Sequence, residues 1–347
     1  MKLNIHEKEA VNWLCEAQDF TLDGGISKFY VIGKGWAEES YKEVSGYIIP
    51  TFLDLFAETK NKEYKERALK IADWEIKVQD TDGKWDYVFD TGQVLLGLTR
   101  AYAETKSQKY VDSIVRAANF LVNVQSKNGS WNNFEFALGL GNKILKNLGL
   151  LNHAYNARTA WALLEVWKIT KNNDYKEAAM KNLDWVLSKQ LKNSYYKNCD
   201  TYLHYLIYTA SGLLEAGLIL KNDKYISSAK LFADNCLQLI QKNGFLQGNF
   251  NKKWLPVKPV HSSLTSDAQL AILFFKLHNL TKNKDYLLAA KKLLNFIKSN
   301  QNITTNNLGI RGGIPGSNPI DGFYCPNTIL SWATKFYLDA LLMERNV

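Results

Sequence analysis

The sequence predicts an all-α protein whose helices form a closed ring of six hairpins. Three observations lead to this prediction: one motif recurs along the chain, two kinds of helix alternate around it, and the two ends supply one helix each. The motif begins with a turn such as Thr59-Lys-Asn-Lys-Glu-Tyr64, runs through an amphipathic helix and ends in a loop. Its turn tyrosines stand at Tyr64, Tyr110, Tyr175, Tyr225 and Tyr286. A constant motif at uneven spacing indicates one repeated supersecondary unit with insertions collected in a loop.

The loop that ends the motif twice reads Gln-x-x-x-Gly-x-Trp, from Gln79 to Trp85 and from Gln125 to Trp131. This spacing resembles the repeat of terpene cyclases, in which the glutamine and the tryptophan tie loops to helix ends. A cyclase of that type also needs an Asp-rich D-x-D-D or D-D-x-x-D motif, which this sequence lacks. We therefore expect a structural role for these residues and no terpene cyclisation.

The helix that precedes each turn is nearly apolar on all sides, which is typical of a buried helix. We expect glycine, alanine and serine in it wherever two such helices approach closely. The first helix, Ile5–Gln18, has no buried partner before it, and the last buried helix has no outer partner after it. Pairing of these two closes the ring into a single domain, residues 1–347. The expected buried helices are Val44–Glu58, Asp90–Glu104, His153–Ile169, Leu203–Leu220, Ser266–Leu280 and Asn327–Met343.

Composition limits the function classes. The chain is 46% hydrophobic and 22% charged, as in an ordinary globular protein. Its formal net charge of +9 is scattered over the repeats, which indicates either a solvated surface or attraction to an acidic polymer. No nucleic-acid-binding module is recognisable, so an acidic polysaccharide is the expected partner. Four separated cysteines, no signal-peptide pattern and no apolar run of membrane length favour a cytoplasmic protein without a membrane span.

Loop lengths locate the expected site. The turns from buried to outer helices are short, whereas the connections from outer to buried helices are long and variable. Long loops on one side of a rigid scaffold usually carry function. The N-termini of the buried helices, which favour anionic groups, point to the same side.

Six hairpins with this turn pattern resemble the six-hairpin glycosidase superfamily, the (α/α)6 toroids. The segments 40–51, 312–317 and 332–340 are similar to members encoded with polysaccharide-biosynthesis genes. The resemblance implies a carbohydrate-active protein, and the superfamily includes hydrolases, lyases and epimerases without choosing among them.

The first candidate constellation is acidic. Glu43 precedes one buried helix, and Asp86 and Asp90 precede the next, so adjacent helices would bring these carboxylates to one rim. Glycoside hydrolysis requires two carboxylates, one as acid and one as base or nucleophile. The structural alternative is that Asp90 is only the N-cap of its helix.

A second constellation is the segment from His153 to Arg158, which also holds Tyr155 and Asn156. It is similar to the Asn, His, Tyr and Arg sets of toroid lyases that act on uronic acids. There, arginine and asparagine neutralise the substrate carboxylate while histidine or tyrosine removes the α-proton. The alternative is that Asn156 and Arg158 anchor the loop.

Histidines leave a third possibility open. His153, His204 and His261 are compatible with an epimerase, because epimerases of N-acyl-hexosamines with the resembled fold use paired histidines. No H-x-x-x-H or H-E-x-x-H motif is present, so neither a metal site nor a cofactor is expected.

Together these observations predict a glycoside hydrolase or lyase that acts on an acidic, uronic-acid-containing oligosaccharide or polysaccharide. The alternatives are a sugar epimerase and a non-catalytic glycan-binding component of a biosynthetic system. We expect aromatic residues to stack on sugar rings and arginines to meet carboxylates. The expected substrate-binding residues are Trp36, Tyr41, Tyr155, Asn156, Arg311 and Tyr324. The expected catalytic residues are Glu43, Asp86, Asp90, His153 and Arg158.

Overall fold

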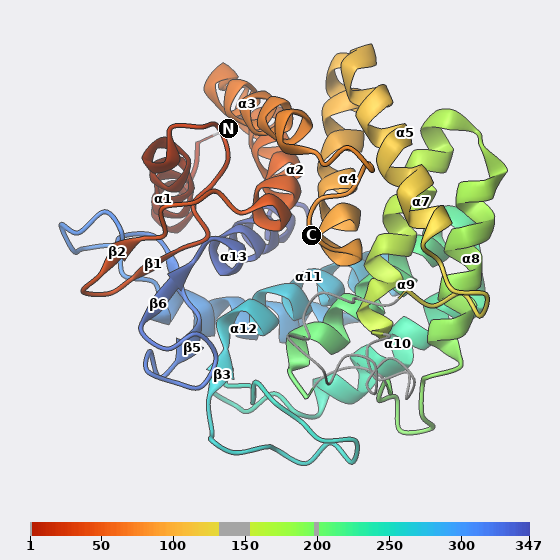
Figure 1. Cartoon of the computed structure of the whole chain (residues 1–347). Coiled ribbons are helices and arrows are strands. Elements are labelled where there is room, and N and C mark those ends of the chain that lie inside the picture. Colours follow the sequence, from red (N-terminus) through yellow and green to blue (C-terminus); the bar gives the residue numbers. More distant parts are fainter. Residues whose placement is uncertain (1, 132–152, 198–200) are drawn as a thin grey trace, which may run out of the picture.

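The computed structural model describes residues 2–131, 153–197 and 201–347, and these contain twelve α-helices in two concentric rings (Figure 1). The inner ring consists of α2 (Lys42–Thr59), α4 (Val88–Thr105), α7 (Ala157–Thr170), α9 (Leu203–Leu220), α11 (Leu264–Thr281) and α13 (Ser331–Glu344). The outer ring consists of α1 (Ile5–Thr21), α3 (Lys62–Val78), α5 (Gln108–Asn123), α8 (Asn173–Leu187), α10 (Asp223–Leu237) and α12 (Lys284–Asn300).

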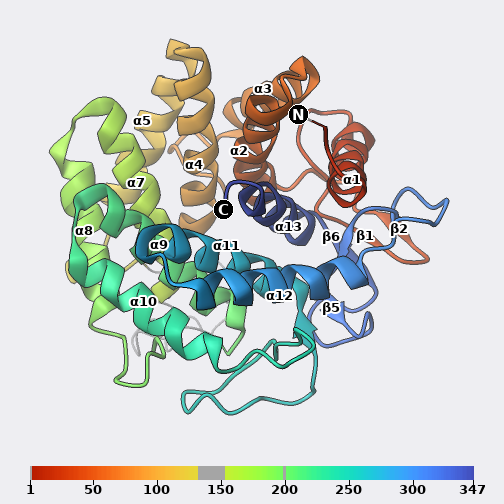
Figure 2. The same cartoon turned by 180° about the vertical axis from the view of Figure 1, so that it is seen from behind.

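The ring closes as the sequence predicts. Each inner helix contacts the next, from α2 through α4, α7, α9 and α11 to α13, and α13 contacts α2 again. Each inner helix also packs against one outer helix, and α13 packs against α1 from the other end of the chain. In both views the C-terminus lies near the centre of the ring (Figures 1 and 2). The prediction of an all-α toroid of six hairpins is therefore confirmed.

The short turns between inner and outer helices share one local chemistry. In the first, Lys60 ends α2 in the left-handed conformation with φ of 62°, and the Asn61 side chain accepts a hydrogen bond from the Glu63 amide. A left-handed residue satisfies the last carbonyls of one helix, and asparagine caps the next helix. Four other helices end on a left-handed lysine, namely at Lys106, Lys171, Lys221 and Lys282.

The turn tyrosines fasten neighbouring outer helices to each other. The Tyr110 hydroxyl donates to Asp73 at 2.9 Å, and the Tyr175 hydroxyl donates to Asn119 at 2.7 Å. Tyr225 makes the corresponding bond to Asp184 at 2.7 Å. The recurrence of tyrosine in the motif thus reflects a repeated contact between one hairpin and the next.

The Gln-x-x-x-Gly-x-Trp loops have the predicted structural role. The Gln79 amide nitrogen donates to the Gly83 carbonyl at 2.7 Å and to the Ser113 carbonyl of the next outer helix at 3.1 Å. The Trp85 indole donates to the Glu75 carbonyl at 2.9 Å. Both side chains use their polar atoms to hold a loop against helix ends, which leaves them unavailable for a ligand.

Glycine allows the inner helices to approach closely. A Cβ atom on Gly97 of α4 would stand 2.1 Å from the Gly46 carbonyl oxygen of α2. A Cβ on Gly212 of α9 would stand 2.4 Å from the Ala157 carbonyl carbon of α7. These contacts confirm the expectation that small residues mark the closest helix crossings.

Short strands, which the sequence analysis did not predict, link the long loops at the two ends of the chain. β2 (Gly35–Trp36), β1 (Phe29–Val31), β6 (Thr328–Leu330) and β4 (Ile314–Pro315) form one antiparallel sheet, and β3 (Ser262–Ser263) pairs with β5 (Ser317–Asn318). The predicted helix Asn327–Met343 was therefore wrong at its start, because 328–330 are paired as a strand and α13 begins at Ser331. The other helices match the expected ranges within a turn.

The expectation that no apolar run reaches membrane length needs a correction for one inner helix. Among the described residues, α9 is long and apolar enough to cross a membrane by length and composition. In this fold 67% of it is buried, and it packs against α7, α10 and α11. Its apolar character is therefore explained by its place in the inner ring.

Candidate active site

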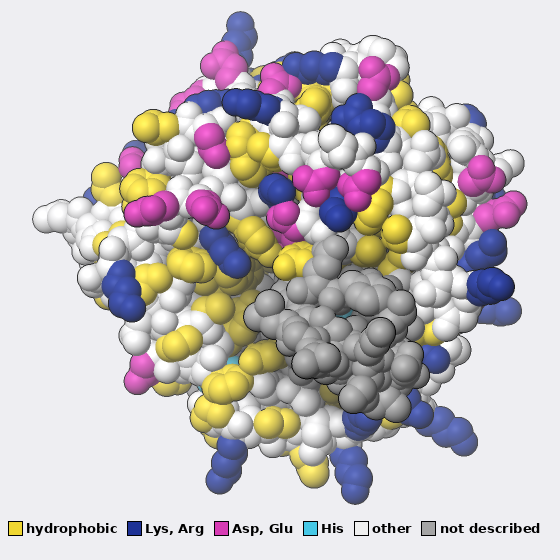
Figure 3. Space-filling view, in the orientation of Figure 1, with side chains coloured by type: hydrophobic (Ala, Val, Ile, Leu, Met, Phe, Trp, Pro, Cys, Tyr) yellow, Lys and Arg dark blue, Asp and Glu magenta, His cyan; other side chains and the backbone are white. Residues whose placement is uncertain are grey.

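A cleft of about 180 Å³ lies at the N-terminal ends of the inner helices, on the side of the long loops. On the face shown in Figure 3, hydrophobic side chains gather around a hollow near the centre. The cleft is lined by Lys28, Tyr41, Glu43, Tyr47, Phe89, Asp90, Tyr155, His204, Tyr205, Tyr208, Tyr324 and Trp332. Six of the candidates named from sequence meet here, namely Tyr41, Glu43, Asp90, Tyr155, His204 and Tyr324.

The two carboxylates reach the cleft because each stands in the first turn of an inner helix. Glu43 belongs to α2 and Asp90 to the neighbouring α4. A helix N-terminus favours negative charge, so this position suits a carboxylate. The N-cap of α4 is Tyr87, which means that Asp90 is not the cap residue and the capping alternative is wrong.

The environment of Glu43 changes its acidity. Desolvation in the cleft raises the pKa of its carboxyl to about 7. The Tyr41 hydroxyl, which hydrogen-bonds to it, and the positive charges of Lys28 and Arg158 lower the pKa and only partly offset this effect. A carboxyl with this pKa is partly protonated near neutral pH and can donate a proton to a substrate.

Lys28 brings a positive charge to the cleft. Its ammonium lies over the Tyr41 ring, 4.1 Å from the centroid. The sheet positions it, because Phe29 of β1 pairs with Leu330 of β6 and the Ser331 amide donates to the Lys28 carbonyl at 3.3 Å. Lys28 is the one lysine or arginine among the described residues that line the cleft.

Aromatic rings form the walls of the cleft. Tyr155 stacks on Tyr205 with 4.9 Å between ring centroids, and His204 lies 4.9 Å from Tyr324. The Trp332 indole donates to the Tyr324 hydroxyl at 3.0 Å, which fixes the orientation of that ring. Aromatic walls with a few polar groups are the usual construction of a small-molecule site.

His204 is a weak base in this setting. Desolvation lowers the pKa of its imidazole to about 3, and Nδ1 is buried without a hydrogen-bond partner in the described part of the chain. Burial also raises the pKa of Tyr208 and holds that of Tyr324 well above its ordinary range. Neutral imidazole and neutral phenols are therefore the stable forms, and Glu43 is the group best matched to proton transfer near neutral pH.

Other predicted residues lie elsewhere. Trp36 packs against Trp13 with ring centroids 4.8 Å apart, and Asp86 forms an ion pair with Lys42 at 2.6 Å. Arg311 binds the Glu9 carboxylate on the outer side of α1, with contacts of 2.8 and 2.9 Å. None of these three predicted residues lines the cleft.

The residues of the predicted His153 to Arg158 segment lie in different environments. His153 stacks on Tyr155 at 4.8 Å and so lies one ring away from the cleft. Asn156 is fully buried and donates to the Trp131 carbonyl at 3.5 Å, which is consistent with a loop anchor. Arg158 does not line the cleft and instead faces a second cavity further along the ring axis.

Sequence reasoning missed several cleft residues. Lys28, Phe89 and Tyr208 belong to no motif, and only the ring geometry brings them together. Trp332 opens the segment 332–340, but nothing in that segment indicates that it lines the cleft. His204, named from the sequence as a candidate histidine, and its neighbour Tyr205 open a buried helix just as Glu43 does. No group of three or more His, Cys, Asp or Glu side chains suited to a metal ion occurs in the described residues.

Solved structures of the same fold cover nearly the whole chain. A cellobiose 2-epimerase from Bacillus thermoamylovorans matches with a TM-score of 0.77 and 14% identity over 99% of this chain and 97% of that chain. An unsaturated glucuronyl hydrolase specific for heparin matches with a TM-score of 0.78 and 15% identity, covering 98% and 96%. A D-mannose isomerase matches with a TM-score of 0.70 and 14% identity, covering 99% and 97%. At these identities the likeness shows the (α/α)6 toroid fold alone.

Sequence comparison adds a family. No curated protein matches the chain. The profile of the family described as the ulvan lyase N-terminal domain matches residues 91–264, just over half of the chain. The matched segment runs from α4 to the start of α11 and includes Tyr155, His204, Tyr205 and Tyr208 of the cleft. The chain therefore belongs to the ulvan lyase N-terminal domain family, and it has the (α/α)6 toroid fold.

Proposed function

We propose that this protein hydrolyses a glycosidic bond in an oligosaccharide that contains a uronic acid. The observation that carries the proposal is Glu43, a carboxyl with a pKa of about 7 that shares an aromatic cleft with a second carboxylate, Asp90. Two carboxyl groups in one sugar-sized cleft are the chemical requirement of glycoside hydrolysis.

In this proposal Glu43 is the general acid. Its proton passes to the glycosidic oxygen as the bond to the anomeric carbon breaks, so the leaving sugar departs as a neutral alcohol. Asp90 is the second carboxylate and acts either as base towards water or as nucleophile at the anomeric carbon. The hydroxyl and hydrogen of one water molecule end on the two products.

An acidic substrate follows from Lys28. Its ammonium lies at the cleft, where a bound uronate carboxylate would be partly desolvated and the attraction would be stronger than in water. Tyr41, Tyr155 and Tyr324 present ring faces and hydroxyls to the sugar. One of the structures with the same fold is a glucuronyl hydrolase, which accords with this substrate class.

β-Elimination is the second candidate, favoured by the family match and by the grouping of His204, Tyr155 and Tyr205 at the cleft. A lyase would remove the proton α to the uronate carboxylate, with Lys28 stabilising the carbanion. The low pKa of His204 weighs against it as the base, so we prefer hydrolysis.

The test is mass spectrometry of a panel of uronic-acid oligosaccharides after incubation with the protein in deuterated water. Fragments that have gained water support the proposal. Shorter fragments with a new double bond would establish the lyase, and unchanged length with deuterium on a ring carbon would establish an epimerase. Binding without conversion of any member would replace both enzyme hypotheses with a glycan-binding role.

A matched pair of variants assigns the acid. Glu43→Gln keeps the shape of the side chain and removes the proton, so hydrolysis should fall by roughly 10²–10⁴-fold. Glu39→Gln makes the same chemical change four residues earlier on an exposed side chain and should leave the rate unchanged. Equal rates for the two variants would show that Glu43 is not the acid.

A further inference from the structure

A second cavity lies on the ring axis beyond the floor of the cleft, with a volume of about 390 Å³. Its lining comes mainly from the middle and C-terminal turns of the inner helices, whereas the cleft is lined by their N-terminal turns. Tyr47 borders both spaces. We call this second cavity the axial chamber. The chemistry proposed for the cleft does not account for this chamber, because neither Glu43 nor Asp90 lines it.

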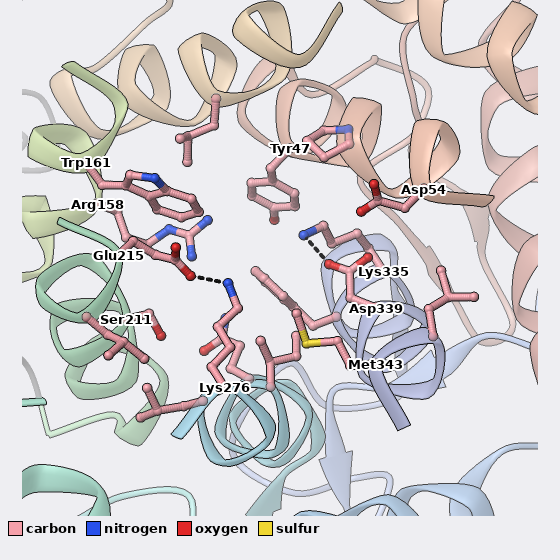
Figure 4. A pocket seen from close by; sticks show the side chains of 18 of the residues that line it. Tyr47, Asp54, Arg158, Trp161, Ser211, Glu215, Lys276, Lys335, Asp339 and Met343 are labelled. Carbon is pink, nitrogen blue, oxygen red and sulfur yellow. Dashed lines mark hydrogen bonds and ion pairs between the residues drawn. The ribbon is translucent and has the colours of Figure 1, made fainter. Parts of the chain in front are cut away.

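Arg158 faces the axial chamber with its charge unpaired. Its side chain is 6% exposed, and its Nε donates to the Gln93 side-chain oxygen at 2.8 Å. Its two terminal nitrogens donate to no acceptor in the described part of the chain. The guanidinium carbon lies 4.8 Å from the Tyr208 ring centroid and 5.4 Å from that of Trp161, so aromatic faces hold it in place. Figure 4 shows the guanidinium pointing into the cavity.

The other charged groups of the axial chamber already have partners. Lys335 pairs with Asp339 at 2.6 Å, Lys276 pairs with Glu215, and Asp54 pairs with Arg100 (Figure 4 shows the first two). Glu58 is engaged as well. The guanidinium of Arg158 is thus left without an ion-pair partner among the described residues, while Glu43 and Glu215 act on it only at longer range.

We propose that the axial chamber is a second binding site, which takes a singly charged organic acid of about monosaccharide size through its carboxylate. The planar fork of arginine binds a carboxylate with two parallel hydrogen bonds, and the two terminal nitrogens of Arg158 offer such a fork. A desolvated cation without a partner is costly, and a bound carboxylate removes that cost.

The rest of the chamber fits a small polar body with one apolar face. Trp161 and Phe336 present ring surfaces next to the guanidinium, with Phe336 at 5.9 Å from its central carbon. Ser211 of α9 and Gln269 of α11 add hydrogen-bonding groups to the lining. The volume lies within the range of about 300–1,000 Å³ that is common for ligand sites. A hydroxylated carboxylic acid satisfies both kinds of surface.

The test is isothermal titration calorimetry with sodium glucuronate, with glucose as the uncharged control. Because the cleft is proposed to bind uronates as well, the decisive protein is the Lys28→Met variant, which lacks the cation of the cleft. We expect two classes of glucuronate site in the unaltered protein, one class in Lys28→Met, and no binding of glucose. Adding Arg158→Gln to Lys28→Met should weaken the remaining binding at least tenfold.

A cavity-filling variant tests the axial chamber without removing Arg158, so that a loss of binding in Arg158→Gln cannot be explained by misfolding alone. Ser211→Leu occupies the axial chamber and leaves Arg158 intact, so it should also abolish the binding that survives in Lys28→Met, with an unchanged circular dichroism spectrum. The proposal is overturned if neither Arg158→Gln nor Ser211→Leu changes that binding, or if no protein binds glucuronate. Binding that disappears with Lys28→Met and persists with Arg158→Gln would place the anion in the cleft alone, which overturns the axial site and supports the proposed function.

Discussion

Glu43 shows how the position of one side chain determines its chemistry. Desolvation moves the pKa of its carboxyl from the ordinary range of glutamate to about 7, although Lys28, Arg158 and Tyr41 all act in the opposite direction. A carboxyl raised in this way carries a proton at a pH where most carboxyl groups have lost theirs. The sequence places glutamate at the start of a buried helix, and the three-dimensional surroundings provide the acidity.

The first prediction concerns the pH dependence of the proposed hydrolysis. An acid acts only when protonated, so kcat/KM should be high below pH 7 and fall as the pH rises through about 7. This fall in kcat/KM reflects the loss of the Glu43 proton, so the residual activity of Glu43→Gln should not change over the same pH range. If the rate instead rises through this range, Glu43 acts as a base, and elimination becomes the better account.

Lys28 gives a second prediction at the same scale. Its positive charge lowers the pKa of Glu43, so Lys28→Met should move the falling limb of the pH profile to higher pH. The variant should also raise KM for a uronate substrate at least several-fold and leave KM for its methyl ester nearly unchanged. Lys34→Met, an exposed lysine beyond β1, is the matched control. Equal losses on acid and ester would remove Lys28 from carboxylate recognition.

At the scale of the element, the turns explain why the motif has its sequence. A lysine in the left-handed conformation ends five of the six inner helices, and an asparagine after four of these lysines caps the following outer helix. Left-handed backbone costs a residue with a Cβ about 1–2 kcal/mol, whereas glycine adopts it freely. The left-handed lysines are therefore slightly strained, and replacing one of them with glycine should raise the free energy of unfolding.

The third prediction concerns the backbone strain at Lys60. Lys60→Gly relieves the strained φ of 62° at an exposed position and should raise the free energy of unfolding by about 0.5–1 kcal/mol, after the entropy cost of glycine. Urea denaturation measures the change. Lys60→Ala removes the same charge but keeps a Cβ, so it should show no such gain. Equal stability of the two variants would mean that the turn is not strained.

At the scale of the whole molecule, ion pairs between the chain ends secure the ring. Glu7 of α1 is 1% exposed, and it receives the guanidinium of Arg345 just after α13. Arg311 reaches Glu9 of the same helix from the loop before β4. Residues from opposite ends of the sequence thus join α1 to the C-terminal part of the ring.

The fourth prediction tests this closure. Arg345→Met leaves the Glu7 carboxylate buried without its cation, which should reduce the free energy of unfolding by about 3 kcal/mol or more. Lys298→Met breaks an ion pair with Glu344 at the end of α13 whose two side chains are each 25% exposed, and it should cost less than about 1 kcal/mol. Calorimetric melting of the two variants compares them. Similar melting temperatures would show that the terminal pair contributes little to closure.

The sequence predicts the ring well because its signals are local. Turn tyrosines, capping asparagines and apolar helices each act within a few residues, and their repetition implies the architecture. The site is harder to predict because it depends on which helix starts converge. Glu43, Asp90 and Tyr155 open inner helices and were found for that reason. Lys28 reaches the cleft because β1 pairs with β6, and Trp36 packs against Trp13 and not in the cleft. Both placements depend on contacts between distant parts of the chain, which no local sequence pattern indicates.

The pairing of α1 with α13 has a consequence for biosynthesis. Because synthesis runs from the N-terminal side, α1 is made long before α13, and the ring cannot close until α13 has emerged. Until then the apolar flanks of α2 and α11 that later pack on α13 stay uncovered, a condition under which chaperones bind. A circular permutant that starts at Lys42 and joins residues 347 and 1 by a short linker would place α1 directly after α13 in the chain. The contact between α1 and α13 would then be local in sequence, so the permutant should refold faster, although the finished toroid would be the same.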